Sequence, residues 1–439
     1  MEQALVSNSA QVALPDATIT PEPYPRYGVV WPTSTYPPGP YPPPTATPMP
    51  ELPEPTELPE PTALPIPTPL PTPMVTPIPT TAPPIIPLPE GTEPEPFTLF
   101  YRDGQVIRSL SSTKEAKAAV FLDPVAEFGL HLIPEGAYSP WGTLSPDGRQ
   151  MALLLTESPD AKMYQATGAR PGIYILDRES RKLRLLVENG FEPVWSPDGQ
   201  RIAYRSESGH LSIVEVGSGD TRIVYKVDRT NSPPESPHNV EEFTWASDSQ
   251  RLAIIDGVGF ESTELIIVNS NIVEPPRSLL NTPDFPRIFS LQWSPIDDQI
   301  LFVWDGKGKD GLRPQIIDQS GKVKQVSSAL QIFGSSPHWS PDGRWILVSG
   351  AADYEAPSTQ ADLWLVDPVG HVTKRLTHDD GGDNPTNYLN DAFPEWSPDG
   401  TQIVYFKENE VWVFSLADGS RQLLMQYPSD SEKQLLVSR

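Results

Sequence analysis

The stretch that decides the fold of this chain is Trp195-Ser196-Pro197-Asp198-Gly199-Gln200-Arg201-Ile202-Ala203-Tyr204. Its Ser-Pro-Asp-Gly core is typical of a tight turn, because Pro presets φ at the second position, Asp bonds to nearby backbone, and Gly takes a positive φ. The Trp ends one strand, and the alternating run that follows Gly begins the next. The stretch therefore predicts a β-hairpin.

This unit recurs along the chain. Its six copies begin at Leu144, Trp195, Trp245, Trp293, Trp339 and Trp396. Successive copies lie about 50 residues apart, and a second pair of strands follows each hairpin, for example at 172–177 and 183–186. Each unit is therefore predicted to contain four antiparallel strands.

Four-stranded units of this length are typical of β-propeller blades, which stack around an axis so that each blade covers its neighbours. The Trp of each unit supplies a large apolar plate for the gap between blades. We predict an all-β fold, a β-propeller with six blades. One further hairpin, at 97–108, either completes the closing blade or forms part of a seventh with residues 434–437. Seven blades are the less favoured alternative.

The repeats resemble those of the TolB-type propeller, and more loosely WD repeats. The resemblance rests on Trp-Ser-Pro-Asp-Gly, the Ile-Ala-Tyr strand, a Leu-Trp-Leu-Val-Asp strand at 363–367 and Arg375-Leu376-Thr377, and it covers about residues 138–426. It implies a six-bladed ring that serves as a binding scaffold. Some related propellers precede peptidase domains, and a few are lyases.

The first 96 residues have a different composition. They hold 30 of the 55 Pro residues, which excludes a packed helix or a central strand there. We predict a disordered Pro/Thr-rich stalk or linker over 1–96, with polyproline II character, and a propeller domain over 97–439. A ligand for domains that bind Pro-rich strands is the second interpretation of the tail.

Net charge and cysteine content limit the partners. The net charge is −25 and no basic run is present, which disfavours nucleic acid and anionic membrane as partners. Cys is absent, so the chain can form no disulfide and holds no thiol nucleophile. No apolar run is long enough to insert into a membrane. We expect a monomer.

The location of the protein is predicted from its tail. The first residues lack the basic and apolar regions of a signal peptide. The Pro/Thr-rich tail nevertheless resembles linkers of secreted and surface proteins of bacteria. We therefore expect an extracytoplasmic location (periplasmic, cell-surface or secreted), with a cytoplasmic one as the alternative.

Function is expected on the long loops, since loops on a rigid frame carry most binding sites. These loops are 155–171, 226–242, 304–313, 351–361 and 377–394. They share one face of the ring, together with the mouth of the channel. The short Ser-Pro-Asp-Gly turns occupy the other face.

Three sets of residues are candidates for a site. The residues that precede the Trp in three successive units are Gln292, His338 and Glu395, which could meet near the axis around a ligand or a metal, or form hydrogen bonds between blades. Three bases, Lys307, Lys309 and Arg313, could meet an anionic group. A cluster of oxygen donors that could bind calcium contains Asp379, Asp380, Asp383 and Asp391; a solvated turn is the alternative.

Motifs of catalysis are scarce, with no Gly-x-Ser-x-Gly, phosphate loop or His-Glu-x-x-His. The sequence therefore favours a non-catalytic scaffold that recognises a protein, peptide or glycan through its long-loop face. The alternative is an enzyme with a site at the channel mouth, a metal-dependent polysaccharide lyase or hydrolase.

Overall fold

The structure is a computed structural model. It describes residues 94–438 except for 114–115, 134–140, 158–170, 229–238, 258–262, 272–273, 283–286, 306–311, 328–329, 333–336, 352–360, 370–372, 378–390 and 429–432. The chain divides into two compact units, Met1–Val75 and Thr76–Arg439. The predicted boundary between tail and propeller at residue 96 stays a prediction.

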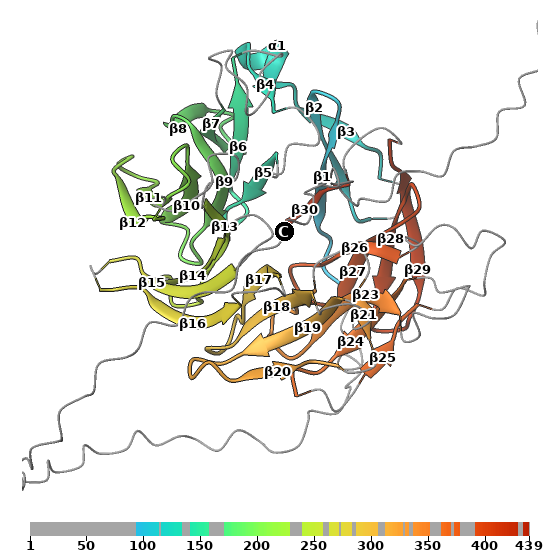
Figure 1. The fold of residues 1–439 in the computed structure, drawn as a ribbon. Coiled ribbons are helices and arrows are strands. Elements are labelled where there is room, and N and C mark those ends of the chain that lie inside the picture. Colours follow the sequence, from blue (N-terminus) through green and yellow to red (C-terminus); the bar gives the residue numbers. More distant parts are fainter. Residues whose placement is uncertain are drawn as a thin grey trace, which may run out of the picture. The chain divides into compact units, whose positions relative to one another are not determined.

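The second unit is a ring of seven antiparallel sheets (Figure 1). Blade 1 consists, from the axis outward, of β30 (Leu435–Ser438), β1 (Thr98–Asp103), β2 (Val106–Ser111) and β3 (Ala119–Leu122). Blade 2 has a divided inner strand, and its elements are β4 (His131–Leu132) with β5 (Gly142–Leu144), β6 (Gln150–Thr156), β7 (Gly172–Asp177) and β8 (Leu183–Val187). A single turn of helix, α1 (Pro124–Phe128), joins these two blades.

The next three blades follow one another in chain order. Blade 3 comprises β9 (Gly190–Trp195), β10 (Arg201–Ser206), β11 (Leu211–Glu215) and β12 (Thr221–Tyr225). Blade 4 comprises β13 (Asn239–Trp245), β14 (Arg251–Gly257), β15 (Thr263–Asn269) and β16 (Arg277–Thr282). Blade 5 comprises β17 (Ile288–Trp293), β18 (Ile300–Asp305), β19 (Leu312–Ile317) and β20 (Val323–Gln325).

Two blades complete the ring. Blade 6, also with a divided inner strand, comprises β21 (Gln331–Ile332) with β22 (His338–Trp339), β23 (Ile346–Ala351), β24 (Asp362–Val366) and β25 (Thr373–Arg375). Blade 7 comprises β26 (Asp391–Trp396), β27 (Gln402–Lys407), β28 (Glu410–Ser415) and β29 (Arg421–Gln426).

The all-β propeller is confirmed, but the preference for six blades was wrong. The hairpin at 97–108 is the β1–β2 pair of a complete seventh blade, whose inner strand β30 comes from the other end of the described chain. Val437 pairs with Leu99 as Trp195 pairs with Ile202, so Val437 occupies the Trp position of blade 1. This pairing closes the ring.

The blade Trp residues pack between blades, as predicted. Trp195 is 7% exposed and packs with Ile173 and Ile175 of blade 2, while Trp245 packs with Ile213 of blade 3. Burial of such side chains stabilises the fold by roughly 25 cal/mol for each Å² of apolar area that is removed from water. The core is thus a series of inter-blade layers.

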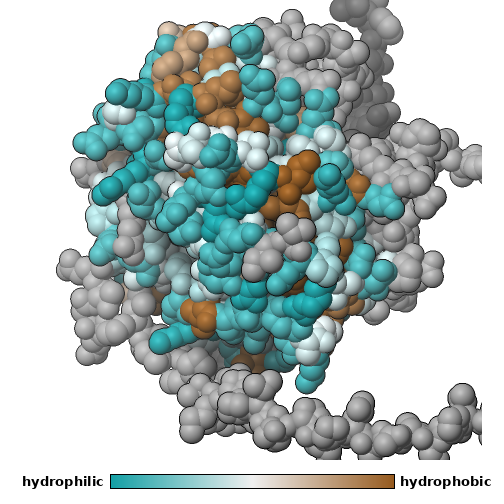
Figure 2. Space-filling model, turned by 90° about the vertical axis from the view of Figure 1, so that its left-hand side faces the viewer, coloured by the Kyte–Doolittle hydropathy of each residue, from teal (hydrophilic) through white to brown (hydrophobic). Residues whose placement is uncertain are grey.

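The outermost strands carry exposed apolar side chains among polar ones. Figure 2 shows hydrophilic residues over much of one side of the described ring, interrupted by a few apolar groups. Leu185 on β8 and Ile223 on β12 are exposed apolar side chains of outermost strands. In the part of the chain that the structure describes, no helix has the length and apolar character needed to cross a bilayer.

Candidate functional site

The two faces of the ring differ in how they are built. Inner strands begin at the face that carries the long loops, which we call the loop face, and end at the face with the Ser-Pro-Asp-Gly turns, the turn face. Large parts of the predicted long loops lie outside the described residues. The described part of the loop face holds a group of ionisable side chains in blades 3 to 5.

Glu241 and Arg287 form an ion pair between blades 4 and 5 on the loop face. The Arg287 Nη2 lies 3.4 Å from the Glu241 Oε2, and the Glu241 side chain is 17% exposed. The Glu241 carboxyl also lies over Gly257, since a Cβ there would come within 2.9 Å of its Cδ. Glu241 is thus held in place but still reachable from solvent.

Burial raises the pKa of Glu241 above its ordinary value. The positive charge and hydrogen bond of Arg287 oppose this shift, while the nearby carboxylates of Glu242 and Asp256 add to it. A carboxyl with a raised pKa keeps its proton to higher pH and can donate it to a leaving group. Glu241 therefore meets one requirement of a general acid, a pKa above the ordinary value.

Asp256 and Tyr225 lie beside this pair. The Tyr225 hydroxyl donates a hydrogen bond of 2.5 Å to Asp256 Oδ2, from the end of β12 in blade 3 to the end of β14 in blade 4. Burial and the Asp256 carboxylate raise the pKa of Tyr225, so the phenol keeps its proton. Tyr225 can orient Asp256 but does not supply a phenolate.

Glu242 is a second acid with a raised pKa, but its carboxylate is engaged in hydrogen bonds with the next blade. Its Oε2 accepts a hydrogen bond of 2.8 Å from the backbone N–H of Leu291 in blade 5. Burial raises the pKa of Glu242, and the N–H donors of Leu291 and Ser290 oppose the shift. We therefore separate Glu242, which ties two blades together, from the more exposed Glu241.

The sequence analysis missed Glu241, Asp256, Tyr225 and Arg287. One signal was present: the adjacent acids at 241 and 242 lie in an inner strand, where apolar residues are usual. Their partner Arg287 lies just before β17, and its pairing with Glu241 across blades leaves no trace in the local sequence.

The predicted trio lies at the other end of the channel. Gln292, His338 and Glu395 each directly precede the Trp at the end of an inner strand, so they lie close to the turn face. The Gln292 Oε1 accepts a hydrogen bond of 2.6 Å from the backbone N–H of Trp339. Burial raises the pKa of Glu395, and the positive charge of His338 opposes the shift. A ligand at these residues stays a prediction.

Of the other predicted site residues, the structure describes Arg313 and the backbone of Asp391. The Arg313 Nη1 donates a 3.1 Å hydrogen bond to the Leu330 carbonyl. Lys307, Lys309, Asp379, Asp380 and Asp383 lie outside the described residues, and of Asp391 only the backbone, at the start of β26, is described. Within the described ranges no three His, Asp or Glu residues are grouped to hold a metal ion. The calcium site stays a prediction.

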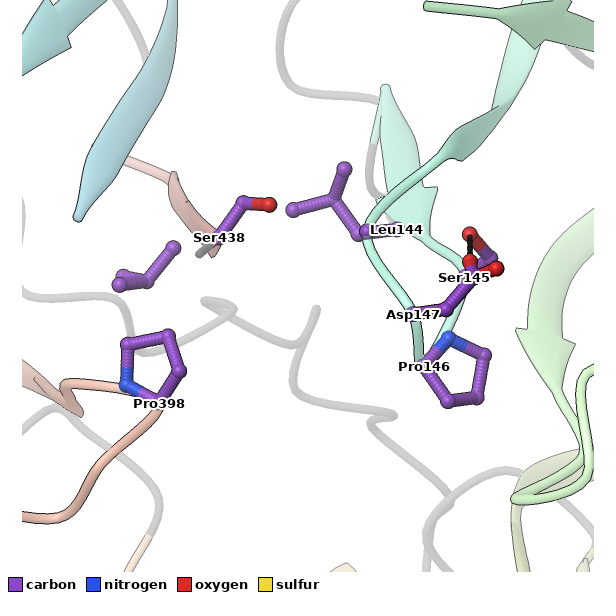
Figure 3. Close-up of a pocket in the computed structure, with 8 residues that line it drawn as sticks. Leu144, Ser145, Pro146, Asp147, Pro398 and Ser438 are labelled. Carbon is purple, nitrogen blue, oxygen red and sulfur yellow. Dashed lines mark hydrogen bonds between the residues drawn. The ribbon is translucent and has the colours of Figure 1, made fainter.

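A second feature lies on the turn face. A cavity of about 390 Å³ opens beside blade 1, and Figure 3 shows Pro398 on one side of it, Leu144 and Pro146 on the other, and Ser438 between them. Asp147 and Gly148 of the blade 2 turn also line it.

Comparison with known proteins identifies relatives of low sequence identity. No family model matches the chain. It is 24% identical over 253 residues to an uncharacterized protein of Agrobacterium fabrum, covering 54% of this chain and 73% of that one. It is 25% identical over 222 residues to the Tol-Pal system protein TolB of Francisella tularensis, covering 49% of this chain and 45% of TolB. The chain thus spans less than half the length of the TolB relatives.

Two solved structures show a similar fold. An oligogalacturonate lyase in complex with manganese aligns with a TM-score of 0.53 at 16% identity, over 76% of this chain and 85% of the lyase. A prolyl endopeptidase aligns with a TM-score of 0.51 at 12% identity, over 78% of this chain and 50% of the peptidase. The chain is a seven-bladed β-propeller that is similar to TolB.

These comparisons correct the functional expectation. The sequence favoured a non-catalytic scaffold that recognises a protein, peptide or glycan. The solved structures with TM-scores above 0.5 are instead oligogalacturonate lyases and a prolyl endopeptidase, so the comparisons do not bear out the preference for a scaffold. The lean toward a non-enzyme is likewise not supported.

Proposed function

We propose that this protein is a propeller enzyme that cleaves a polysaccharide at the loop face, by hydrolysis, with Glu241 as the acid. The observation that carries the proposal is the partly exposed Glu241 carboxyl, whose pKa is raised, beside Asp256. Hydrolysis of a glycosidic bond typically uses two carboxyl groups of unequal proton affinity. The likeness of the fold to an oligogalacturonate lyase supports a glycan as the substrate class.

Each residue has a chemical role in this proposal. Glu241 gives its proton to the glycosidic oxygen as the bond from that oxygen to the anomeric carbon breaks. The Asp256 carboxylate takes a proton from water, whose oxygen bonds to the anomeric carbon. Tyr225 orients Asp256 through its hydrogen bond, and Arg287 holds Glu241 in position.

Elimination is the less favoured reaction. A lyase needs a base that removes a proton from carbon, and a tyrosine serves this purpose only as phenolate. The raised pKa of Tyr225 keeps it protonated. Tyr225 is therefore not the base of an elimination at this site, and we favour hydrolysis, in which Asp256 acts on water.

The test is an assay of the full chain on a panel of neutral glycans and polygalacturonate, with and without manganese. Hydrolysis produces new reducing ends alone, whereas elimination also produces an unsaturated sugar that absorbs ultraviolet light. We expect reducing ends alone, and a loss of about a hundredfold or more in Glu241→Gln. The matched control is Glu179→Gln, an exposed acid between β7 and β8 on the turn face.

Three results would contradict the proposal. These are no cleavage of any glycan, unchanged cleavage by a folded Glu241→Gln variant, and an ultraviolet-absorbing product. Proline-containing peptides form a separate arm, because a prolyl endopeptidase shares the fold. Cleavage in that arm alone would replace the glycan proposal with a peptidase.

An extracytoplasmic location remains part of the proposal. It is supported by the similarity to TolB proteins and by the Pro/Thr-rich tail. A polysaccharide of the cell envelope or the surroundings would be an accessible substrate there.

A further inference from the structure

One of the eleven Trp residues of the chain, Trp304, lies at the loop face. It belongs to β18, the second strand of blade 5, and comes one residue before that strand ends. The Trp residues that end the inner strands of blades 3 to 7 are at most 9% exposed, whereas Trp304 is partly exposed. A partly exposed Trp offers an apolar ring and a polar N–H to a partner.

The Trp304 side chain faces blade 4. Its Cα partner in β17 is Ile288, and residues paired in this way point to the same face of a sheet. Ile288 lies in the core layer between blades 4 and 5, to which blade 4 contributes Ile255. Trp304 packs against this layer, and its ring centroid lies 6.2 Å from that of Phe302, two residues earlier on the same face. Trp304 therefore covers the loop-face end of the layer.

Glu241 lies at the same end of this layer, on the side of blade 4. Gly257 comes two residues after Ile255 in β14, so a Cβ on Gly257 would also point toward blade 5. Such a Cβ would come within 2.9 Å of the Glu241 Cδ, so the Glu241 carboxyl occupies that space. Blades 4 and 5 are neighbours in the ring (Figure 1). Glu241 and Trp304 therefore lie at one end of the same inter-blade layer.

Arg287 connects the surroundings of these two side chains. Its carbonyl accepts a 2.9 Å hydrogen bond from the backbone N–H of Asp305, the residue after Trp304. Its guanidinium lies 3.4 Å from the Glu241 carboxyl. Glu241 and Trp304 thus border one short stretch of the loop face.

The indole N–H of Trp304 reaches solvent. Trp364 of blade 6 and Trp412 of blade 7 are also partly exposed. Their N–H groups donate to the Gly350 carbonyl and to the Glu410 carboxylate, at 3.0 and 2.9 Å. Among the described residues none accepts a hydrogen bond from the Trp304 Nε1, and this atom is not one of the buried nitrogens that lack a partner. Trp304 therefore has a donor available beside its ring.

We propose that Trp304 is the platform on which a sugar ring of the glycan lies while Glu241 acts at the adjoining glycosidic bond. A pyranose ring carries C–H groups on its faces and hydroxyls at its rim. The Trp304 ring can stack against the faces, and its N–H can donate to a hydroxyl. Trp304 therefore determines how tightly the site binds a glycan chain. This inference rests on the proposed function, to which it adds the residue that recognises the sugar ring.

Binding measurements on the full chain test this platform. Glu241→Gln is the parent protein, because it removes the acid and so prevents cleavage during the measurement. The probes are hexasaccharides of the neutral glycans of the cleavage panel and of galacturonate, and calorimetry gives Kd. We expect at least one probe to bind, and Trp304→Leu to weaken its binding about tenfold or more. Trp304→Phe should keep Kd within about threefold, because Phe keeps a flat aromatic face and Leu does not.

The matched control is Trp412→Leu, which changes a partly exposed Trp in the layer between blades 6 and 7 and should leave Kd unchanged. A melting curve checks that each variant folds, and Trp304→Met replaces Trp304→Leu if the latter does not. In the chain with Glu241 intact, Trp304→Leu should raise KM and change kcat little, a split that a general loss of structure would not produce.

The outcomes separate this inference from the proposed function. Equal Kd in the parent and in a folded Trp304→Leu variant overturns the platform, while cleavage that depends on Glu241 leaves the proposed function in place. Equal losses in Trp304→Phe and Trp304→Leu, or in Trp412→Leu and Trp304→Leu, also overturn the platform. If no probe binds and no glycan is cleaved, both proposals are wrong.

Discussion

The Glu242 carboxylate of blade 4 accepts a hydrogen bond from the backbone N–H of Leu291 in blade 5, at 2.8 Å. Leu291 lies in an irregular stretch of β17, where pairing with β18 shifts between Phe289 and Gln292 and Ser290 takes a φ of 58°. An irregular strand leaves backbone donors without ladder partners. Glu242 of blade 4 thus supplies a hydrogen-bond acceptor for a backbone donor in β17, the inner strand of blade 5.

Glu242→Ala should therefore destabilise the fold by about 1–3 kcal/mol, because the Leu291 N–H loses its acceptor in a buried place. Glu242→Gln keeps an acceptor and removes the buried charge. Because burial raises the pKa of Glu242 in the folded state, the wild type should lose stability as pH rises through that pKa. The Gln variant should lose less over the same range, because Glu241 and Glu395, whose pKa values burial also raises, remain. Denaturant unfolding between acidic and neutral pH measures both effects. Equal pH dependence of the two proteins would contradict this assignment.

The blade architecture was predictable from sequence because its signal is local. Ser-Pro-Asp-Gly encodes a turn through the backbone preferences of its own residues, and even Ser249, which replaces the Gly, takes a φ of 57° in the structure. The number of blades was not predictable in this way. β30 pairs with β1 across more than 300 residues. At the Trp position of this blade stands Val437, without the Trp-Ser-Pro-Asp-Gly motif that marks the other blades in the sequence.

The candidate site was less predictable for a related reason. Glu241 and Arg287 are 46 residues apart and belong to different blades. Their contact depends on how two inner strands are stacked, and on a shift in pairing between Val240 and Glu242 that lets Glu241 leave the regular alternation. Sequence periodicity describes one strand at a time, so it predicts core positions and misses charged pairs between blades.

The closing strand should contribute strongly to stability. Leu435 on β30 is 6% exposed and packs with Tyr101, Phe406 and Tyr427. Leu435→Ala should cost about 2–4 kcal/mol through lost burial and the cavity that remains. The matched control is Leu423→Ala on β29, where the side chain is 42% exposed and the cost should stay below about 1 kcal/mol. Similar losses in the two variants would mean that blade 1 does not close the ring in solution.

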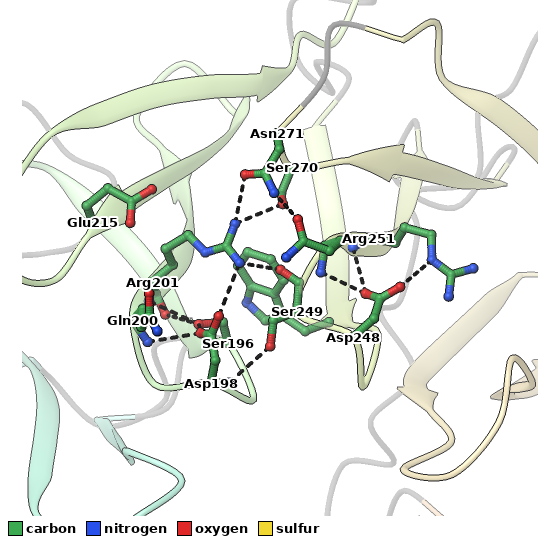
Figure 4. Close-up of polar contacts among 12 residues, drawn as sticks. Ser196, Asp198, Gln200, Arg201, Glu215, Asp248, Ser249, Arg251, Ser270 and Asn271 are labelled. Atoms are coloured by element: carbon green, nitrogen blue, oxygen red, sulfur yellow. Dashed lines mark hydrogen bonds and ion pairs between the residues drawn. The ribbon is translucent and has the colours of Figure 1, made fainter.

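Arg201 connects the turns of blades 3 and 4 (Figure 4). Its guanidinium donates to Ser270 and Asn271 at 3.1 and 3.0 Å, to the Ser249 carbonyl and to Asp198, and it lies 5.2 Å from the centroid of the Trp245 ring. The residue is 5% exposed.

Arg201→Ala should destabilise the fold by about 3–5 kcal/mol, because it leaves the buried Ser270 hydroxyl and the buried Ser249 carbonyl without this donor and removes the contact with Trp245. Arg149→Ala is the control: this side chain is 85% exposed and should cost less than about 0.5 kcal/mol. Thermal and denaturant unfolding compare the two variants. A small loss for Arg201→Ala would indicate that water satisfies these acceptors in solution.

Arg287 should control the pH range of the proposed activity. Its charge lowers the pKa of Glu241 against the larger effect of burial, so Arg287→Gln should raise that pKa further. Because Glu241 acts as the protonated acid, activity is lost at alkaline pH as Glu241 loses its proton, and the alkaline limb of the pH–rate profile should move to higher pH in Arg287→Gln. Arg287→Lys keeps the charge and should leave the limb near its wild-type position. A melting curve checks that both variants fold. An alkaline limb that stays in place in a folded Arg287→Gln variant, or moves to lower pH, would show that another group donates the proton.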